Sequence, residues 1–98
     1  MRSLSELELE IVRWAEARRI IPNAKAQTQL MKTVSELGEL CDAEIKGDMA
    51  GIMDGVGDVL VTLIIYCDLK KISLRECLEL VMTPAQKEVF IVIDECSE

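Results

Sequence analysis

Two pairs of carboxylates lie near the middle of the chain. Glu36 and Glu39 are three residues apart, and Asp54 and Asp58 are four residues apart. Either spacing places both side chains of a pair on one face of a helix. If the two helices pack antiparallel, the four carboxylates can converge in one cleft, where they repel one another unless a cation lies between them. The pattern therefore predicts a site for a divalent metal ion.

The expected ligands are oxygen atoms alone, because the sequence has no histidine and no zinc-type spacing of cysteines. Hard cations such as Mg²⁺ or Mn²⁺ prefer oxygen ligands, and Mg²⁺ commonly shares the phosphates of a substrate. Spacing alone gives roughly equal weight to a second interpretation, in which Glu36 and Glu39 are solvated residues of an amphipathic helix. Asp54 and Asp58 favour the metal site, because aspartate is a poor helix-interior residue and Asp58 leads into the most apolar run of the chain.

Length and composition favour one small all-α domain. Half of the 98 residues are hydrophobic but only 3% are aromatic, so the core must be built from aliphatic side chains. This composition suits helices packed on helices, and a chain this short commonly finishes burying its apolar surface by self-association. We therefore expect an oligomer rather than a monomer.

The net charge and the cysteines indicate which kinds of partner the protein binds and in which cellular compartment it lies. The net charge of −7 argues against binding to nucleic acid polymers, because phosphate backbones are held by clustered Lys and Arg. The N-terminal residues lack the apolar run of a signal peptide, and the longest apolar run, residues 59–67, is too short to span a bilayer. We expect a cytoplasmic protein without a membrane partner, whose thiols are reduced and mostly buried. These thiols belong to Cys41, Cys67, Cys77 and Cys96.

Capping signals and apolar periodicity predict the first two helices. Ser3 and Glu6 form a capping box for a helix that extends to about residue 19. Pro22 interrupts the helical pattern, and Asn23 is a suitable N-cap for the second helix. Gly47 can end that helix.

The same signals predict two further helices. Asp48 can cap a third helix over about residues 49–69, in which the run 59–67 should be central or lie at a subunit interface. Close helix approach, or room beside the acidic side chains, would explain its glycines, which are Gly51, Gly55 and Gly57. Ser73 and Glu76 form a second capping box, for a fourth helix that ends at about residue 82.

The last residues are ambiguous. Residues 84–98 could form a short fifth helix, whereas Val89 to Ile93 has the β-branched content of a strand. We favour helix or irregular structure there.

Short motifs along the chain carry a resemblance to a known family. In order, they are Trp14-Ala15, Lys25-Ala26-Gln27, Lys32-x-x-x-Glu36-x-x-Glu39-Leu40, Asp54-x-x-Gly57-Asp58-Val59-Leu60-Val61 and Leu74-x-x-Cys77-Leu78-Glu79. This set resembles the MazG-like nucleotide pyrophosphohydrolases of the all-α NTP pyrophosphatase superfamily, from about residue 10 to about residue 82. The specific part is E-x-x-E followed by G-D-V-L at this distance.

The resemblance implies a Mg²⁺-dependent enzyme that cuts a nucleoside or deoxynucleoside triphosphate between its α and β phosphates. The products would be a monophosphate and pyrophosphate, in a nucleotide-pool housecleaning role. Glu36, Glu39 and Asp58 would hold the metal and form the catalytic centre. The resemblance also implies one domain over residues 1–98, a four-helix bundle-like chain that completes its core as a homodimer or homotetramer.

Three departures from the family pattern matter. Gly55 occupies a position at which the family usually has a glutamate, and Asp54 is the expected substitute ligand. Ser35 stands where many members have another glutamate. Residues 83–98 form an apolar and acidic tail instead of the basic segment that helps relatives to bind phosphates.

Other residues must then contact the substrate. The candidates for phosphate contacts are Lys32, Lys25 and Lys87, and Trp14 could stack on a base. For Lys32, an ion pair with Glu36 on the helix surface and a contact with phosphate are about equally expected. For Trp14, a position in the core is favoured over base stacking by about two to one.

Two non-enzymatic alternatives remain open at this point. In the first, the chain is a helical oligomerisation module that binds nucleotide or metal without turnover, because the basic C-terminal segment is missing. In the second, which has less weight, it is a structural helical partner such as a small regulatory subunit.

Overall fold

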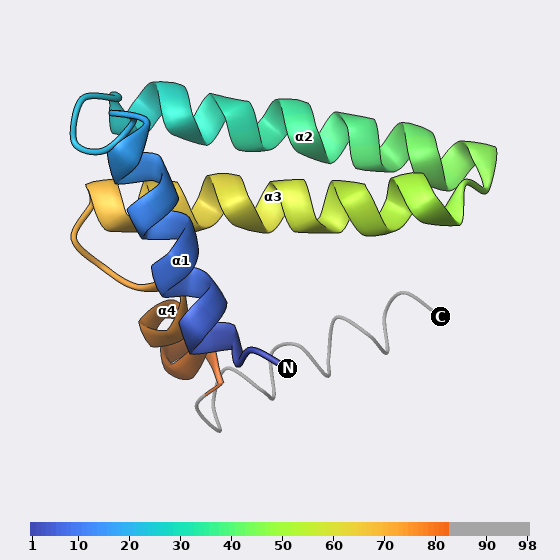
Figure 1. Cartoon of the computed structure of the whole chain (residues 1–98). Coiled ribbons are helices and arrows are strands. Elements are labelled where there is room, and N and C mark those ends of the chain that lie inside the picture. Colours follow the sequence, from blue (N-terminus) through green and yellow to red (C-terminus); the bar gives the residue numbers. More distant parts are fainter. Residues whose placement is uncertain (83–98) are drawn as a thin grey trace.

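The computed structural model describes residues 1–82, which form four α-helices and no strand (Figure 1). These are α1 (Leu4–Ala17), α2 (Ala26–Lys46), α3 (Met49–Leu69) and α4 (Leu74–Val81). Helices α2 and α3 form a long antiparallel hairpin, and α1 crosses α3 near its C-terminal end (Figure 1). The all-α prediction is confirmed for this part of the chain. The two alternatives for residues 84–98 lie outside the described residues.

Local capping bonds begin three of the helices as the sequence predicts. The Ser3 hydroxyl accepts a hydrogen bond from the Glu6 amide at 3.1 Å, and the Glu6 carboxylate accepts one from the Ser3 amide at 3.3 Å. Asp48 caps α3 by accepting from the Gly51 amide at 3.1 Å. Ser73 caps α4 by accepting from the Glu76 amide at 3.0 Å. Each bond satisfies an amide that has no partner within the first turn.

The predicted start of the second helix was wrong. Helix α2 begins at Ala26, and its N-cap Lys25 makes no side-chain capping bond. Asn23 instead donates from Nδ2 to the backbone oxygen of Arg19 at 3.0 Å, within the turn that follows α1. Arg19 has a positive φ of 60°, so α1 ends at Ala17, before the predicted residue. The amide side chain of Asn23 therefore stabilises the interhelical loop and not the helix start.

The α2–α3 connection consists of Gly47 and Asp48. Gly47 has φ 68°, in the left-handed region that glycine adopts without the strain of a β-carbon. Further along the hairpin, a Cβ added at Gly55 would lie 3.0 Å from the Cβ of Leu40 and 3.1 Å from its Cα. Gly55 thus permits close approach of α3 to α2, as the sequence predicts. A Cβ at Gly57 would meet nothing within 4 Å in the described chain.

Alanine substitutions at these two glycines should have opposite effects on stability. Gly55→Ala is expected to lower the free energy of unfolding by about 1–2 kcal/mol, because overpacking against α2 outweighs the gain in helix propensity. Gly57→Ala is expected to raise it by up to about 1 kcal/mol through propensity alone. Chemical denaturation of both variants measures the difference. Equal stability of the two variants would show that α2 and α3 can move apart at Gly55 without a loss of stability.

The buried core is small and lies where α1 crosses α3. Ala15, Ile21 and Ile65 are buried together, between α1, the loop after it and the C-terminal half of α3. No large side chain within residues 1–82 is fully buried. The sequence favours a core position for Trp14, but this side chain is 45% exposed. The Arg18 guanidinium lies 5.3 Å from the centre of its ring. The described chain therefore leaves much apolar surface uncovered.

Most of that uncovered surface lies on the hairpin. Apolar residues that are between 38% and 84% exposed recur along both helices, at intervals of three and four residues except for one interval of eight on α2. We call these residues the apolar face; they are Leu30, Val34, Leu37 and Ile45 on α2, and Met49, Met53, Val56 and Leu60 on α3.

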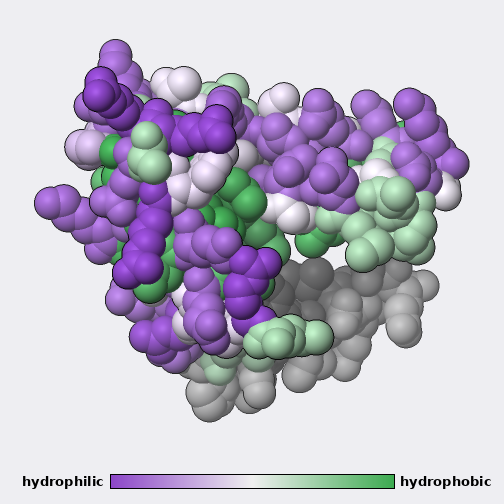
Figure 2. Space-filling model, in the orientation of Figure 1, coloured by the Kyte–Doolittle hydropathy of each residue, from purple (hydrophilic) through white to green (hydrophobic). Residues whose placement is uncertain are grey.

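The apolar face and the acidic pairs lie on opposite sides of the hairpin. At about 100° per residue, the apolar residues of α2 are rotated by about 40–120° from Thr33, and those of α3 by about 120–180° from Thr62, in the same rotational sense. The acidic pairs are rotated in the other direction. Because the helices run antiparallel, the two apolar rows share one side. In the view that has α1 in front of α3, hydrophilic side chains (purple) predominate over the half of α2 that is nearer the interhelical turn (Figure 2).

Helix α3 as a whole is long and apolar enough to cross a membrane, although the uninterrupted run 59–67 is too short to do so. Its most apolar stretch has a mean hydropathy of 1.6, and only 22% of that stretch is buried within the chain. The core helix of a soluble protein passes the same test of length and composition. Within residues 1–82, most of the apolar side of α3 is therefore uncovered.

The cysteines differ in environment. Cys67 is buried, and its burial beside Cys77 raises the pKa of its thiol to about 11. Cys77 is half-buried and Cys41 is exposed, so the prediction of mostly buried thiols holds for α3 but not for α2. Cys96 lies outside the described residues.

Candidate functional site

The hairpin brings the two predicted acidic pairs to facing helices. Glu36 and Glu39 lie on α2, and Asp54 and Asp58 lie on α3. A shallow cleft of about 310 Å³ runs between the helices towards the turn. Three of the four predicted ligands line it, and these are Glu39, Asp54 and Asp58.

Glu36 lies beside this cleft and is electrostatically connected to it. Its pKa is raised, first by side-chain hydrogen bonding with Glu39 and by desolvation, and then by the negative charges of Glu39 and Asp58. Lys32, one turn earlier on α2, acts in the opposite direction and lowers the pKa of Glu36. The three carboxylates therefore repel one another in this arrangement. A bound cation would relieve that repulsion.

The side chains are not arranged as a closed metal cage. Within residues 1–82, no group of three or more Asp, Glu or Cys side chains is close enough together to hold a metal ion. Glu39 and Asp54 are exposed, whereas Glu36 and Asp58 are half-buried. Exposed carboxylates change rotamer easily, so the donor set fits a hard cation if Glu39 and Asp54 turn towards the two half-buried residues.

The predicted substrate-binding residues are not all near the acidic group. Lys32 is close enough to influence Glu36. Lys25 is exposed at the start of α2, and Trp14 lies on α1; neither lines the cleft. Lys87 lies outside the described residues. Lys32 is therefore the predicted phosphate contact that the fold places beside the carboxylates.

The structure adds two residues that the sequence analysis did not single out. Asp42 and Lys46 line the cleft together with Glu39. They follow Glu39 at intervals of three and four residues, a spacing that places all three side chains on one side of α2. This periodicity was visible in the sequence. Lys46 brings a positive charge to the end of the cleft near the turn, where it could contact a phosphate.

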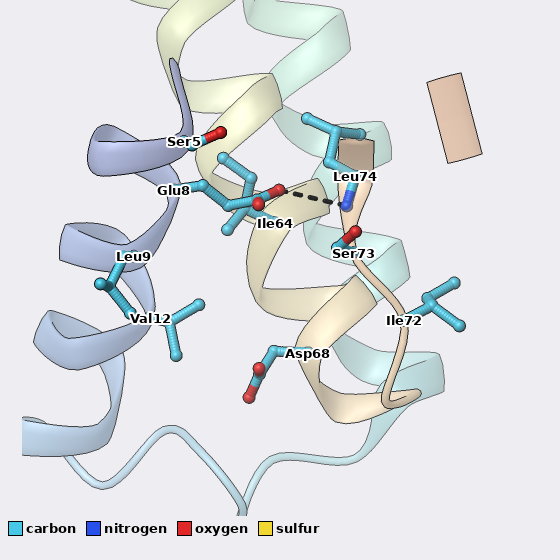
Figure 3. A pocket seen from close by; sticks show the side chains of 9 residues that line it. All are labelled: Ser5, Glu8, Leu9, Val12, Ile64, Asp68, Ile72, Ser73 and Leu74. Carbon is cyan, nitrogen blue, oxygen red and sulfur yellow. Dashed lines mark hydrogen bonds between the residues drawn. The ribbon is translucent and has the colours of Figure 1, made fainter. Parts of the chain in front are cut away.

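A second cavity, of about 210 Å³, lies between α1, α3 and the start of α4 (Figure 3). Two acidic residues, Glu8 and Asp68, line it, and Glu8 accepts a hydrogen bond from the Leu74 amide at 3.1 Å. Glu8 thus caps α4 from a neighbouring helix, where the positive end of the helix dipole stabilises its charge. This contact gives the Glu8 carboxylate a structural role. The acidic cleft on the hairpin, which several carboxylates line, is therefore the stronger candidate site.

Comparisons with known proteins leave the function open. No family model matches the chain, and no solved structure matches it. The chain is similar to an uncharacterized 18.2 kDa protein in the rep-hol intergenic region of Haemophilus phage HP1 (strain HP1c1), with 35% identity over 65 residues. The match covers 66% of this chain but only 40% of the phage protein. The chain thus spans less than half of that relative, whose description assigns it no activity.

Proposed function

We propose that the chain is a Mg²⁺-dependent hydrolase that converts nucleoside or deoxynucleoside triphosphates to monophosphates and pyrophosphate. The observation that carries the proposal is the placement of Glu36, Glu39 and Asp58 on two facing helices, where the charges of Glu39 and Asp58 act on Glu36 and would be offset by a bound cation. The motif resemblance to the MazG-like family supplies the reaction class. The proposed role is housecleaning of the cytoplasmic nucleotide pool.

The proposed chemistry needs few protein groups. Glu36, Glu39 and Asp58 would hold Mg²⁺, with Asp54 as a further ligand in place of the residue lost at Gly55. When bound, the metal polarises phosphate oxygens, offsets developing negative charge and lowers the pKa of an attacking water. A carboxylate of the group that is not fully used as a ligand can accept the proton of that water.

Positive charges on either side of the carboxylates would bind the phosphates. Lys32 lies one turn before Glu36, and Lys46 lies at the end of the cleft near the turn. Together these lysines would provide part of the positive charge that MazG-like proteins carry in a basic C-terminal segment. A lysine ammonium binds phosphate as a point charge and needs no fixed geometry.

The proposal includes self-association through the apolar face. This surface covers one side of both long helices and has no cover within residues 1–82. Contiguous apolar surface of this kind marks an interaction site. A second copy, whose own apolar face is identical, would bury both surfaces in a bundle of four long helices and leave the acidic sides exposed. The proposed assembly is a homodimer or a homotetramer.

Incubation with Mg²⁺ and each common nucleoside or deoxynucleoside triphosphate tests the activity. We expect monophosphate and pyrophosphate as products, and we expect a chelator to abolish their formation. Separation of the nucleotides by ion-exchange chromatography identifies the bond that is cut. Diphosphate with inorganic phosphate would show that a different bond is cleaved, and the absence of any product would exclude the enzyme.

A binding module without turnover is the second candidate. It is favoured by the open arrangement of the ligands, which form no three-residue metal cluster within the described chain. Such a module would still be stabilised by its ligand, by about 2.7 kcal/mol at a concentration 100 times the Kd. Thermal stabilisation by Mg²⁺ or Mn²⁺ without product formation would identify this candidate. Absence of both stabilisation and turnover would point to a structural partner protein.

A further inference from the structure

A buried polar network crosses the α2–α3 interface beyond the carboxylates. Gln29 donates from Nε2 to the backbone oxygen of Thr62 at 3.2 Å, and the Thr33 hydroxyl donates to the Thr62 hydroxyl at 2.9 Å. The Thr62 hydroxyl in turn donates to the backbone oxygen of Val59 at 2.7 Å. Gln29 is 5% and Thr62 is 8% exposed, and they are the buried polar residues of the described chain.

Stability alone does not explain this network. When both partners of such a hydrogen bond are replaced by apolar side chains of similar shape, the change is commonly neutral or stabilising, because the polar groups must be desolvated on folding. What hydrogen bonds add is direction, since their geometry tolerates only small displacements. In paired helices, a single buried polar contact can select one register among several of similar energy.

The network is aligned with the candidate site on both helices. On α2, Gln29, Thr33 and Glu36 follow at intervals of four and three residues; on α3, Asp58 and Thr62 are four residues apart. The pair Thr33 and Thr62 is therefore about one turn from the level of Glu36 and Asp58.

A second contact fixes the hairpin on the other side of that level. Gly55 approaches Leu40 closely, about one turn from Glu36 and Asp58 in the direction of the interhelical turn. The carboxylates thus lie between a steric contact and a hydrogen-bonded contact. A shift of α2 along or around α3 would break at least one of the two and would separate the carboxylates.

We propose that Gln29, Thr33 and Thr62 are positioning residues for the carboxylate site. Their hydrogen bonds hold α2 in the axial position and rotation that bring Glu36 to the level of Asp58. The proposal rests on the proposed function, since it concerns the geometry of that metal site. It assigns to these residues no contact with metal or substrate.

Substitution of the threonines by valine tests the proposal, because valine keeps the shape and removes the hydroxyl. For Thr62→Val we expect a modest loss of thermal stability, because the Thr33 hydroxyl loses its acceptor. We also expect affinity for Mn²⁺ and kcat each to be lowered by about 10- to 100-fold, as for residues that orient metal ligands. Thr33→Val removes one donor and should have a smaller effect of the same kind. Thr62→Ser keeps the hydroxyl and should restore both quantities. Calorimetric titration with Mn²⁺ and steady-state kinetics with Mg²⁺ provide the readouts.

The matched control is Thr28→Val, at an exposed position of α2 that takes no part in the network. It should leave affinity and turnover unchanged. If Thr62→Val and Thr33→Val are folded and bind Mn²⁺ as the unmodified protein does, the network is only structural and the inference is wrong. If Thr62→Val does not fold, Thr33→Val decides the question. If the unmodified protein neither binds Mn²⁺ nor hydrolyses nucleotides, the proposed function itself fails.

Discussion

Asp58→Asn is expected to abolish Mg²⁺-dependent turnover, with kcat/KM lowered by about 100-fold or more, while the fold is retained. Asp58 is half-buried on α3 and contributes one of the charges that raise the pKa of Glu36. The amide keeps the shape of the side chain but removes the charge that a metal needs. Because one of several like charges is lost, the metal-free variant should be as stable as the unmodified protein or more so. Kinetics and thermal unfolding with and without Mg²⁺ measure both effects.

The combination of lost activity and retained or increased stability distinguishes a site residue from a structural one. Glu36→Gln and Glu39→Gln should behave in the same way. Glu44→Gln is the matched control, because Glu44 is an exposed residue of α2 that does not line the cleft. Full activity in any of the three site variants would remove that residue from the metal site.

A protein with both Val34→Glu and Val56→Glu is expected to be a monomer. Both valines belong to the apolar face, one on each long helix, and are 59% and 45% exposed in the single chain. A carboxylate there stays solvated in the monomer, but in an assembled bundle it would be buried without a partner. A penalty of about 3 kcal/mol or more raises the Kd for self-association by at least about 100-fold. Sedimentation velocity over a range of concentrations measures the change.

Leu80→Glu provides the control, because Leu80 is 72% exposed on α4 and lies outside the apolar face. It should not change the assembly. If the unmodified protein is itself a monomer at all concentrations, self-association is excluded. Binding of that monomer to lipid vesicles, abolished by Val34→Glu with Val56→Glu, would then identify lipid as the cover of α3.

The features that could be predicted from the sequence are those determined over short distances. Ser3, Asp48 and Ser73 cap their helices because each bond joins residues only three positions apart. Gly47 ends α2 for an equally local reason. The placement of the acidic pairs on facing helices was also predictable, because two long helices joined by a short turn pack antiparallel.

The features that could not be predicted depend on contacts between distant residues. Asn23 has a good capping side chain, but the loop after α1 uses it in another bond. The exposure of Trp14 depends on where α1 crosses α3. The pairing of Gln29 and Thr33 with Thr62 requires the register of the two helices, which periodicity does not contain. The positions of Asp42 and Lys46 could have been predicted from their helical spacing after Glu39. They were missed because the family motif ends at Leu40.

The short turn of Gly47 and Asp48 also bears on the order in which the molecule can form. Closing so short a connection loses little chain entropy, and helical proteins with local contacts fold on the order of microseconds to milliseconds. Every predicted metal ligand lies within residues 36–58, on the two sides of this turn. The proposed site can therefore assemble before α1 docks on α3. A cation bound there would act on the folding chain itself, by neutralising the repulsion that opposes closure of the hairpin.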